Sequence, residues 1–129
     1  MKSSISHLQE QKQQEILAIA ETLHSMVKPE MIILFGSYAR GNWVDDSYTE
    51  NQITYTYKSD FDFLVVVDDE RKANIKEKKI REKLRKQLHP DIPIQVIVHG
   101  IDYLNKELED GQYFFTDILK EGVLIFNSE

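Results

Sequence analysis

Residues 34–41 read Leu-Phe-Gly-Ser-Tyr-Ala-Arg-Gly, and residues 59–67 read Ser-Asp-Phe-Asp-Phe-Leu-Val-Val-Val. In the first stretch an apolar run enters a Gly-Ser turn. In the second, two aspartates one residue apart open another apolar run. Short, continuously apolar runs are typical of buried strands. These two stretches therefore predict two strands, at Met31–Phe35 and Phe61–Val67, that bring a Gly-Ser turn close to a pair of carboxylates.

The turn at Gly36 and Ser37 has the properties of a phosphate cradle. Glycine lets the backbone bend sharply and approach a ligand without a Cβ in the way. Ser37 adds a hydroxyl and an N–H, and a helix that begins here would point further N–H groups at an anion. A Gly-Ser pair after a strand is more often a simple turn. The chain has no Gly-x-Gly-x-x-Gly and no Walker motif, so it gives no support to a Rossmann or P-loop fold.

Asp60 and Asp62 form the second half of the candidate site. Residues i and i+2 of a strand point to the same face, roughly 6.5–7 Å apart along the backbone. Two carboxylates placed in this way can bridge metal ions about 3.5–4 Å apart, as in phosphoryl and nucleotidyl transfer. Magnesium prefers a few carboxylates together with substrate phosphates. The alternative is that both aspartates only solvate the end of a strand.

The hydrophobic pattern along the rest of the chain predicts alternating helices and strands. Residues 42–58 read as an extended loop or hairpin, and Gly122 as a glycine cap for the last helix. This order predicts the α/β (α+β) class, with a small mixed sheet covered by helices. The predicted helices are 6–27, 70–88, 101–109 and 113–121, and the predicted strands are 31–35, 61–67, 93–98 and 123–126.

Composition narrows the class of protein. The 129 residues suit one domain, and the hydrophobic content of 41% allows a real core. There is no cysteine, which excludes disulfides, zinc–thiolate sites and thiol chemistry. The longest apolar runs are far below the roughly 18 residues of a membrane span, so no membrane is expected as a partner. The N-terminus is polar, unlike a signal peptide, and the expected location is the cytoplasm.

The charge of the chain is unevenly distributed. Its formal net charge of -6 argues against a general nucleic-acid binder. Residues 70–88, however, hold nine Lys/Arg against three Glu, which leaves seven basic and nineteen acidic residues elsewhere. The simpler interpretation is a solvated helix face that balances its own protein. The other is a surface that docks an acidic partner, RNA or nucleotide phosphates.

Taken together, the run from Gly36 to Gly41 and the run from Ser59 to Asp62 resemble the nucleotidyltransferase superfamily that includes DNA polymerase beta and kanamycin nucleotidyltransferase. The nearest likeness is to the minimal nucleotidyltransferases (MNT group), small proteins associated with a helical HEPN domain. Residues 115–126 also look like that group. The resemblance covers residues 31–126 and implies a nucleotidyltransferase fold. It places a single domain over residues 1–129, alone or as the N-terminal part of a longer protein with a C-terminal HEPN domain.

The resemblance also implies a role for each matching residue. Asp60 and Asp62 would bind Mg²⁺ in a two-metal site and act in catalysis. Gly36 and Ser37 would hold the β- and γ-phosphates of a nucleoside triphosphate, with ATP favoured. Arg40 would contact phosphate or lock the turn, and the alternative for this residue is a surface ion pair. The implied reaction is transfer of a nucleoside monophosphate to a hydroxyl, such as a tyrosine of a partner protein.

Three departures from the family pattern qualify this hypothesis. Tyr38 stands where many relatives have arginine, and the link at residues 42–58 is longer than usual. The third acidic position of the family falls on Gln95, whose amide carries no charge and cannot act as a base. Asp91 and Asp102 are the nearest acids, and neither fits the spacing.

Two functions therefore stay open. The first is a transferase of the nucleotidyl-transfer type, with turnover slowed by Gln95. The second is an inactive, antitoxin-like module of a toxin–antitoxin pair, which binds a HEPN-type partner through its acidic surface or its basic helix. Trp43, Tyr48, Tyr55 and Tyr57 offer faces for stacking on a base, but packing within a hairpin is expected instead. The four histidines show no ligand spacing and no paired acid.

Overall fold

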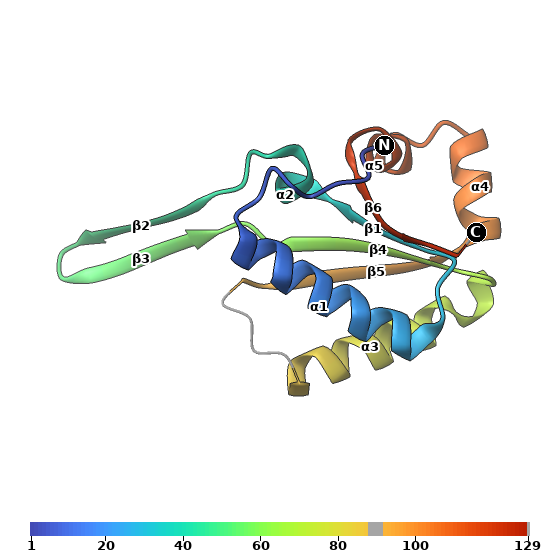
Figure 1. Ribbon diagram of the computed structural model, residues 1–129, viewed down its shortest axis with the longest axis horizontal. Coiled ribbons are helices and arrows are strands. Elements are labelled where there is room, and N and C mark those ends of the chain that lie inside the picture. The colour runs from blue at the N-terminus through green and yellow to red at the C-terminus, as the bar shows by residue number, and fades with distance from the viewer. Residues whose placement is uncertain (88–91, 129) are drawn as a thin grey trace.

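A four-stranded mixed sheet forms the centre of the molecule (Figure 1). The computed structural model describes residues 1–87 and 92–128, and only the backbone of residues 45–48, 55–58 and 87. The strand order is β5-β4-β1-β6, in which β4 and β5 run parallel and the other pairs antiparallel. The strands are β1 (Met31–Phe35), β4 (Phe61–Val67), β5 (Ile94–Gly100) and β6 (Val123–Asn127).

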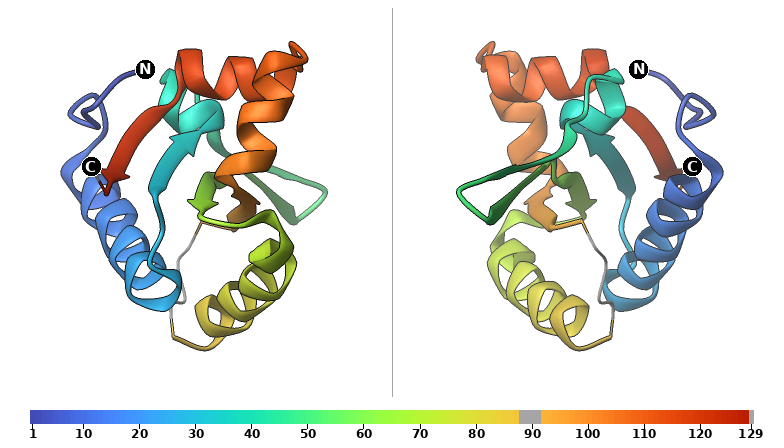
Figure 2. Two further views of the ribbon diagram at one scale, coloured as in Figure 1. Left: turned by 90° about the vertical axis from the view of Figure 1, so that its right-hand side faces the viewer. Right: turned by 90° about the vertical axis from the view of Figure 1, so that its left-hand side faces the viewer.

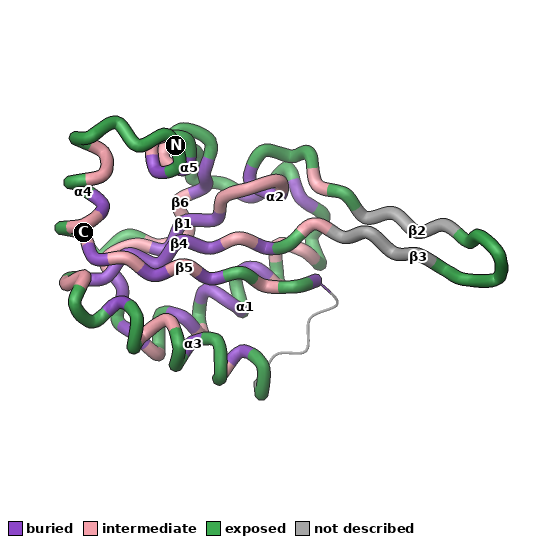
Figure 3. The backbone as a smooth tube through the Cα atoms, turned by 180° about the vertical axis from the view of Figure 1, so that it is seen from behind, coloured by how far each residue is buried: buried purple, intermediate pink, exposed green. Residues whose placement is uncertain are grey.

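Helices cover both faces of this sheet (Figure 2). Side chains of a strand alternate between faces, so the two central strands feed two apolar layers. Ile32 and Phe63 pack towards α1 and α3, whereas Ile33 and Leu64 pack towards α4 and α5. The two central strands are buried over most of their length (Figure 3). The helices are α1 (Glu10–Val27), α3 (Ala73–Gln87), α4 (Ile101–Glu109) and α5 (Tyr113–Glu121).

The short helix α2 (Gly36–Arg40) follows β1 without a loop and is tied to the N-terminal segment. The Lys2 ammonium donates to the carbonyl of Ala39 at 2.7 Å, and His7 Nε2 lies 2.7 Å from the carbonyl oxygen of Tyr38. The backbone of Lys2 also pairs with β6, through hydrogen bonds to Gly122 and Leu124. The first residues of the chain thus fix α2 against the edge of the sheet.

The segment between α2 and β4 forms a hairpin of β2 (Asp45–Glu50) and β3 (Ile53–Lys58). Asn51 and Gln52 both have positive φ angles, which is typical of the tight turns that match strand twist. The ribbon extends away from the main sheet (Figure 1). Of the two structures predicted for residues 42–58, the hairpin is confirmed.

The bounds of several predicted elements differ in the structure. Helix α1 begins at Glu10 and not at Ser6, because Ile5 and Leu8 are buried in a turn before the helix. Gly122 is confirmed as the cap of α5, where its N–H donates to the carbonyl of Ile118, and its conformation is extended. Glycine is needed there because a Cβ would collide with the carbonyl oxygen of Ile118. Of the predicted basic helix, residues 70–72 form a 3₁₀ turn, and residues 88–91 lie outside the described part.

The predicted class is confirmed, since the sheet is mixed and its helices form two covering layers. The predicted burial of β4 is also confirmed, since this strand lies between β5 and β1. Across residues 1–87 and 92–128, none of the helices combines the length and apolar character that a membrane crossing requires.

Candidate functional site

The carboxylate of Asp62 lies against the backbone of Gly36. The β1–β4 register places Asp62 opposite Phe35, one residue before the turn. Gly36 has a φ of +76°, a conformation that L side chains rarely adopt. A Cβ at position 36 would collide with the Asp62 carboxylate oxygen. Glycine therefore permits both the bend and the approach of the acid, and the structure brings these two residues together as the sequence predicts.

Burial of Asp62 makes its negative charge costly. The side chain is half-buried, and this desolvation raises its pKa from 3.8 to about 6. The neighbouring charge of Asp60 raises the pKa further, and the Arg40 guanidinium opposes both effects. Asp60 and Asp62 are thus close enough to repel each other. A cation between them would relieve that repulsion.

Asp60 is exposed and directly precedes the first residue of β4. Its neighbours hold it in place. The hydroxyl of Ser59 accepts a hydrogen bond from the Val44 N–H at 2.7 Å, and the Phe61 N–H donates to the carbonyl of Pro93 at 2.9 Å. Within the described residues, no group of three or more acids or histidines is placed to hold a metal ion. The site is therefore a pair of carboxylates.

The third acidic position of the family pattern lies beside this pair and holds an amide. In the parallel β4–β5 register, Gln95 is the partner of Asp62, and its side chain is exposed. Asp102 instead accepts a hydrogen bond from the Glu70 N–H at 3.1 Å, in the region where β5 ends and α4 begins. Asp91 lies outside the described residues. No described acid replaces the missing carboxylate.

Ser37 and Arg40 lie on α2, beyond Gly36. The Ser37 carbonyl accepts hydrogen bonds from the N–H groups of Gly41 and Asn42, which closes the helix. Its hydroxyl has no hydrogen-bond partner in the described part of the chain. Arg40 forms an ion pair with Glu121 of α5, with 3.6 Å between the charged atoms. Sequence reasoning did not find this partner.

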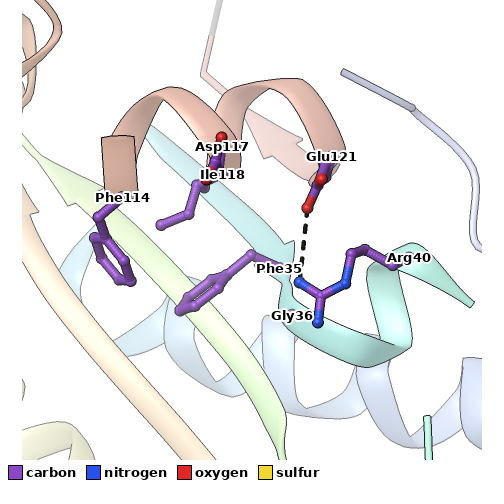
Figure 4. A pocket seen from close by; sticks show the side chains of 7 residues that line it. All are labelled: Phe35, Gly36, Arg40, Phe114, Asp117, Ile118 and Glu121. Atoms are coloured by element: carbon purple, nitrogen blue, oxygen red, sulfur yellow. Dashed lines mark ion pairs between the residues drawn. The ribbon is translucent and has the colours of Figure 1, made fainter. Parts of the chain in front are cut away.

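A pocket of about 240 Å³ opens between α2 and α5, beside Gly36 (Figure 4). Phe35 and Phe114 give it an apolar end, and the Arg40–Glu121 pair lies at the other end. Sequence reasoning missed this pocket. The signal for it was the run of three aromatic residues at 113–115, of which only the third is buried in the structure. The lining residues are Phe35, Gly36, Arg40, Phe114, Asp117, Ile118 and Glu121.

Trp43 and His99 each form a contact that bears on the predictions for aromatic and histidine residues. Trp43 stacks on Tyr38, with 5.5 Å between ring centroids and 6° between ring planes. This is packing against α2 and not, as had been expected, within the hairpin of β2 and β3. The side chains of Tyr48, Tyr55 and Tyr57 lie outside the description. The prediction that no histidine has a paired acid was wrong for one residue. His99 Nδ1 lies 3.0 Å from a carboxylate oxygen of Glu70, a contact between residues 29 positions apart that sequence spacing cannot reveal.

The comparison with protein families agrees with this geometry. Residues 17–129 match the family model described as "Polymerase beta, Nucleotidyltransferase". The chain therefore belongs to the polymerase beta nucleotidyltransferase family. No curated protein and no solved structure matches it significantly.

Replacing Gly36 by alanine tests the contact with Asp62. Gly111 is the matched control, because it has a φ of +71° but no atom near the position of a Cβ. We expect Gly111→Ala to lower the free energy of unfolding by about 1 kcal/mol, from the backbone conformation alone. Gly36→Ala should cost roughly 1–3 kcal/mol more, since the new methyl also displaces the carboxylate. Urea unfolding of both variants measures the difference, and equal losses would show that the contact is not tight.

The raised pKa of Asp62 predicts a pH effect on stability in the absence of metal. A carboxyl whose pKa is higher in the folded state contributes most below pH 3.8, and this contribution is lost as the pH rises through about 6. Relative to Asp62→Asn, the free energy of unfolding of the wild-type protein should fall by about 1 kcal/mol from pH 4 to pH 7. This figure is smaller than the pKa shift alone would give, because solvent screens the charge of a half-exposed group. Urea unfolding in EDTA tests this, and a constant or rising difference would contradict it.

Proposed function

We propose that the chain binds a magnesium nucleoside triphosphate, with ATP favoured, and transfers its nucleoside monophosphate to a hydroxyl acceptor. The observation that carries this proposal is the Asp62 carboxylate held against the Gly36 turn, in a chain of the nucleotidyltransferase family. A phosphate-binding turn and a metal-binding acid are both needed for this chemistry, and here they are in contact.

The residues present suit magnesium. Asp60 and Asp62 offer oxygen donors that repel each other, and few protein ligands are needed when phosphates supply the rest. Bound Mg²⁺ would neutralise charge on the phosphates and on the leaving group. The two aspartates would hold the ion and orient the α-phosphate towards the acceptor. Asp62 is fixed by the β1–β4 register, so its direction is set before the ligand arrives.

The turn would hold the other phosphates. The backbone of Gly36 lines the pocket beside α2. The hydroxyl of Ser37, which has no partner among the described residues, can donate a hydrogen bond to an anionic oxygen. The guanidinium of Arg40 can also bind a phosphate. Its ion pair with Glu121 is long and half-exposed, and pairs of this kind contribute about 0–1 kcal/mol. Little free energy would therefore be lost if a phosphate replaced Glu121 as the partner of the Arg40 guanidinium.

Gln95 limits the rate in this proposal. Its amide cannot take a proton from the acceptor hydroxyl, and it is a weaker ligand than a carboxylate. The likeness to the MNT group suggests a hydroxyl of a HEPN-type partner, such as a tyrosine, as the acceptor. Slow transfer to one well-positioned partner is compatible with a two-carboxylate site.

Transfer of label from radiolabelled ATP to a candidate HEPN-type partner tests the proposal. Asp62→Asn should lower labelling at least about 100-fold, because one of two metal ligands loses its charge. Asp110→Asn is the control, since this exposed acid lies at the end of α4 and should leave labelling unchanged. Gln95→Glu should raise labelling by restoring a carboxylate beside Asp62. If nothing is labelled and Asp62→Asn does not alter Mg-ATP binding, the proposal fails.

A second candidate function is an inactive module that binds a helical partner, and the charge on α3 favours it. Lys79, Lys83 and Lys86 line a groove of about 380 Å³ together with Glu82 of α3 and Met26 of α1. None of the three lysines forms an ion pair with a described acid, whereas Arg81 pairs with Glu77 at 3.2 Å. Unpaired cations along a groove suit an acidic partner.

Charge reversal tests whether the groove lined by these lysines is a docking face for the partner, distinct from the rest of the basic helix. The double variant Lys79→Glu/Lys83→Glu should weaken binding of the HEPN-type partner by at least about ten-fold at low salt, with less effect at high salt. The control is Lys78→Glu/Arg85→Glu, because these exposed residues do not line the groove. Calorimetry with the purified partner gives both affinities. Equal losses in the two double variants would indicate a general charge effect and not a docking face.

A further inference from the structure

Two large aromatic side chains at the start of α5 are left in contact with solvent. Tyr113 is 84% exposed and Phe114 is 50% exposed. The next residue, Phe115, is buried together with Ile118, and these two residues hold the helix on the sheet. Phe114 is therefore not required to fix α5. An exposed ring that lines a pocket is a candidate for binding a ligand.

The pocket connects this ring to the acidic pair. Phe35 is the register partner of Asp62, and partners in an antiparallel pair lie on the same face of the sheet. The rings of Phe35 and Phe114 meet edge to face, with 5.9 Å between centroids and 84° between planes. The pocket thus runs from the Arg40–Glu121 pair, past Gly36, to two aromatic rings (Figure 4).

The two ends of the pocket differ in chemistry. One end offers a guanidinium and an open backbone turn, which suit phosphate. The other offers the face of Phe114, which suits a flat aromatic group because every nucleobase has a π-face. Between them, Asp117 is a lining residue of the pocket, and a carboxylate can accept hydrogen bonds from an amino group. A nucleotide carries phosphate, a flat ring and, in most bases, an amino group.

We infer that the pocket between α2 and α5 is a nucleobase site, in which Phe114 supplies the stacking face and Asp117 favours a base with an exocyclic amino group. The inference rests on the proposed function, because phosphates on the Gly36–Ser37 turn place the base within reach of this pocket. It assigns contacts with the base to Phe114 and Asp117 of α5, which lie outside both sequence motifs.

The test compares Mg-ATP with magnesium tripolyphosphate, which has the phosphates but no base. Calorimetry on the full chain should show that Phe114→Ala weakens Mg-ATP about 5- to 150-fold, the range for loss of one stacked base. The same variant should bind tripolyphosphate as the wild type does. Tyr113→Ala is the matched control, because its ring is more exposed but does not line the pocket, and it should bind both ligands normally.

Two further variants refine the result. Phe114→Leu keeps an apolar side chain without a π-face. Its affinity for Mg-ATP should lie between those of the wild type and Phe114→Ala. Asp117→Asn should reduce the preference for ATP over inosine triphosphate, whose base has no amino group. Thermal unfolding of each variant confirms that it is folded before its affinity is interpreted.

The other outcomes are distinct. If Phe114→Ala leaves Mg-ATP binding unchanged, the base lies elsewhere and this inference is overturned while the proposed function stands. If Phe114→Ala weakens both ligands equally, the ring supports the turn and does not stack on a base. If it weakens only a HEPN-type partner, the pocket docks protein. If the wild type binds neither ligand, the proposed function fails as well.

Discussion

The contact between the Asp62 carboxylate and the Gly36 backbone is the constraint on which the candidate site depends. It is set by the β1–β4 register, which places Asp62 one residue from the turn, and by a positive φ at a residue without a Cβ. The arrangement does not stabilise the free protein, because it half-buries a charge and raises the pKa of its carboxyl. A structure that keeps a costly acid in this place is more readily explained by ligand binding than by folding.

The rest of the fold holds that contact rigid. Phe61 and Phe63 point from the same strand into the opposite apolar layer, so Asp62 cannot turn without moving the core. Helix α2 is fixed by the Tyr38 ring, which packs on Phe61 and Trp43, and by side chains of the N-terminal segment. The Gly36 turn and Asp62 therefore belong to one packed unit, and neither lies on a loop outside the core.

The sequence predicts the parts of this structure that depend on local pattern. The apolar runs located β1 and β4, and the helical periodicity located α4 and α5 with their observed bounds. Periodicity shows which side of an element is buried, but not what lies opposite it. The Arg40–Glu121 pair, the Phe35–Phe114 contact and the His99–Glu70 pair each join residues distant in the sequence, so no local signal predicts them. The buried turn at Ile5 and Leu8 was missed for a related reason, since it depends on packing against other elements.

The position of Gln95 in the sheet shows how its uncharged side chain affects Asp62. The register places its amide next to Asp62, where a third carboxylate would add a like charge to an acid whose pKa is already raised. The amide reduces repulsion in the metal-free protein, and it removes a base and a strong ligand at the same time. Under the proposed function, nucleotide binding through Gly36, Ser37 and two aspartates would not need that third charge, whereas proton removal from an acceptor would. Binding would therefore persist where turnover declines, so a transferase of this kind would be slow without losing its nucleotide. The partner module is a separate candidate, because it uses the groove on α3 and not the acidic pair.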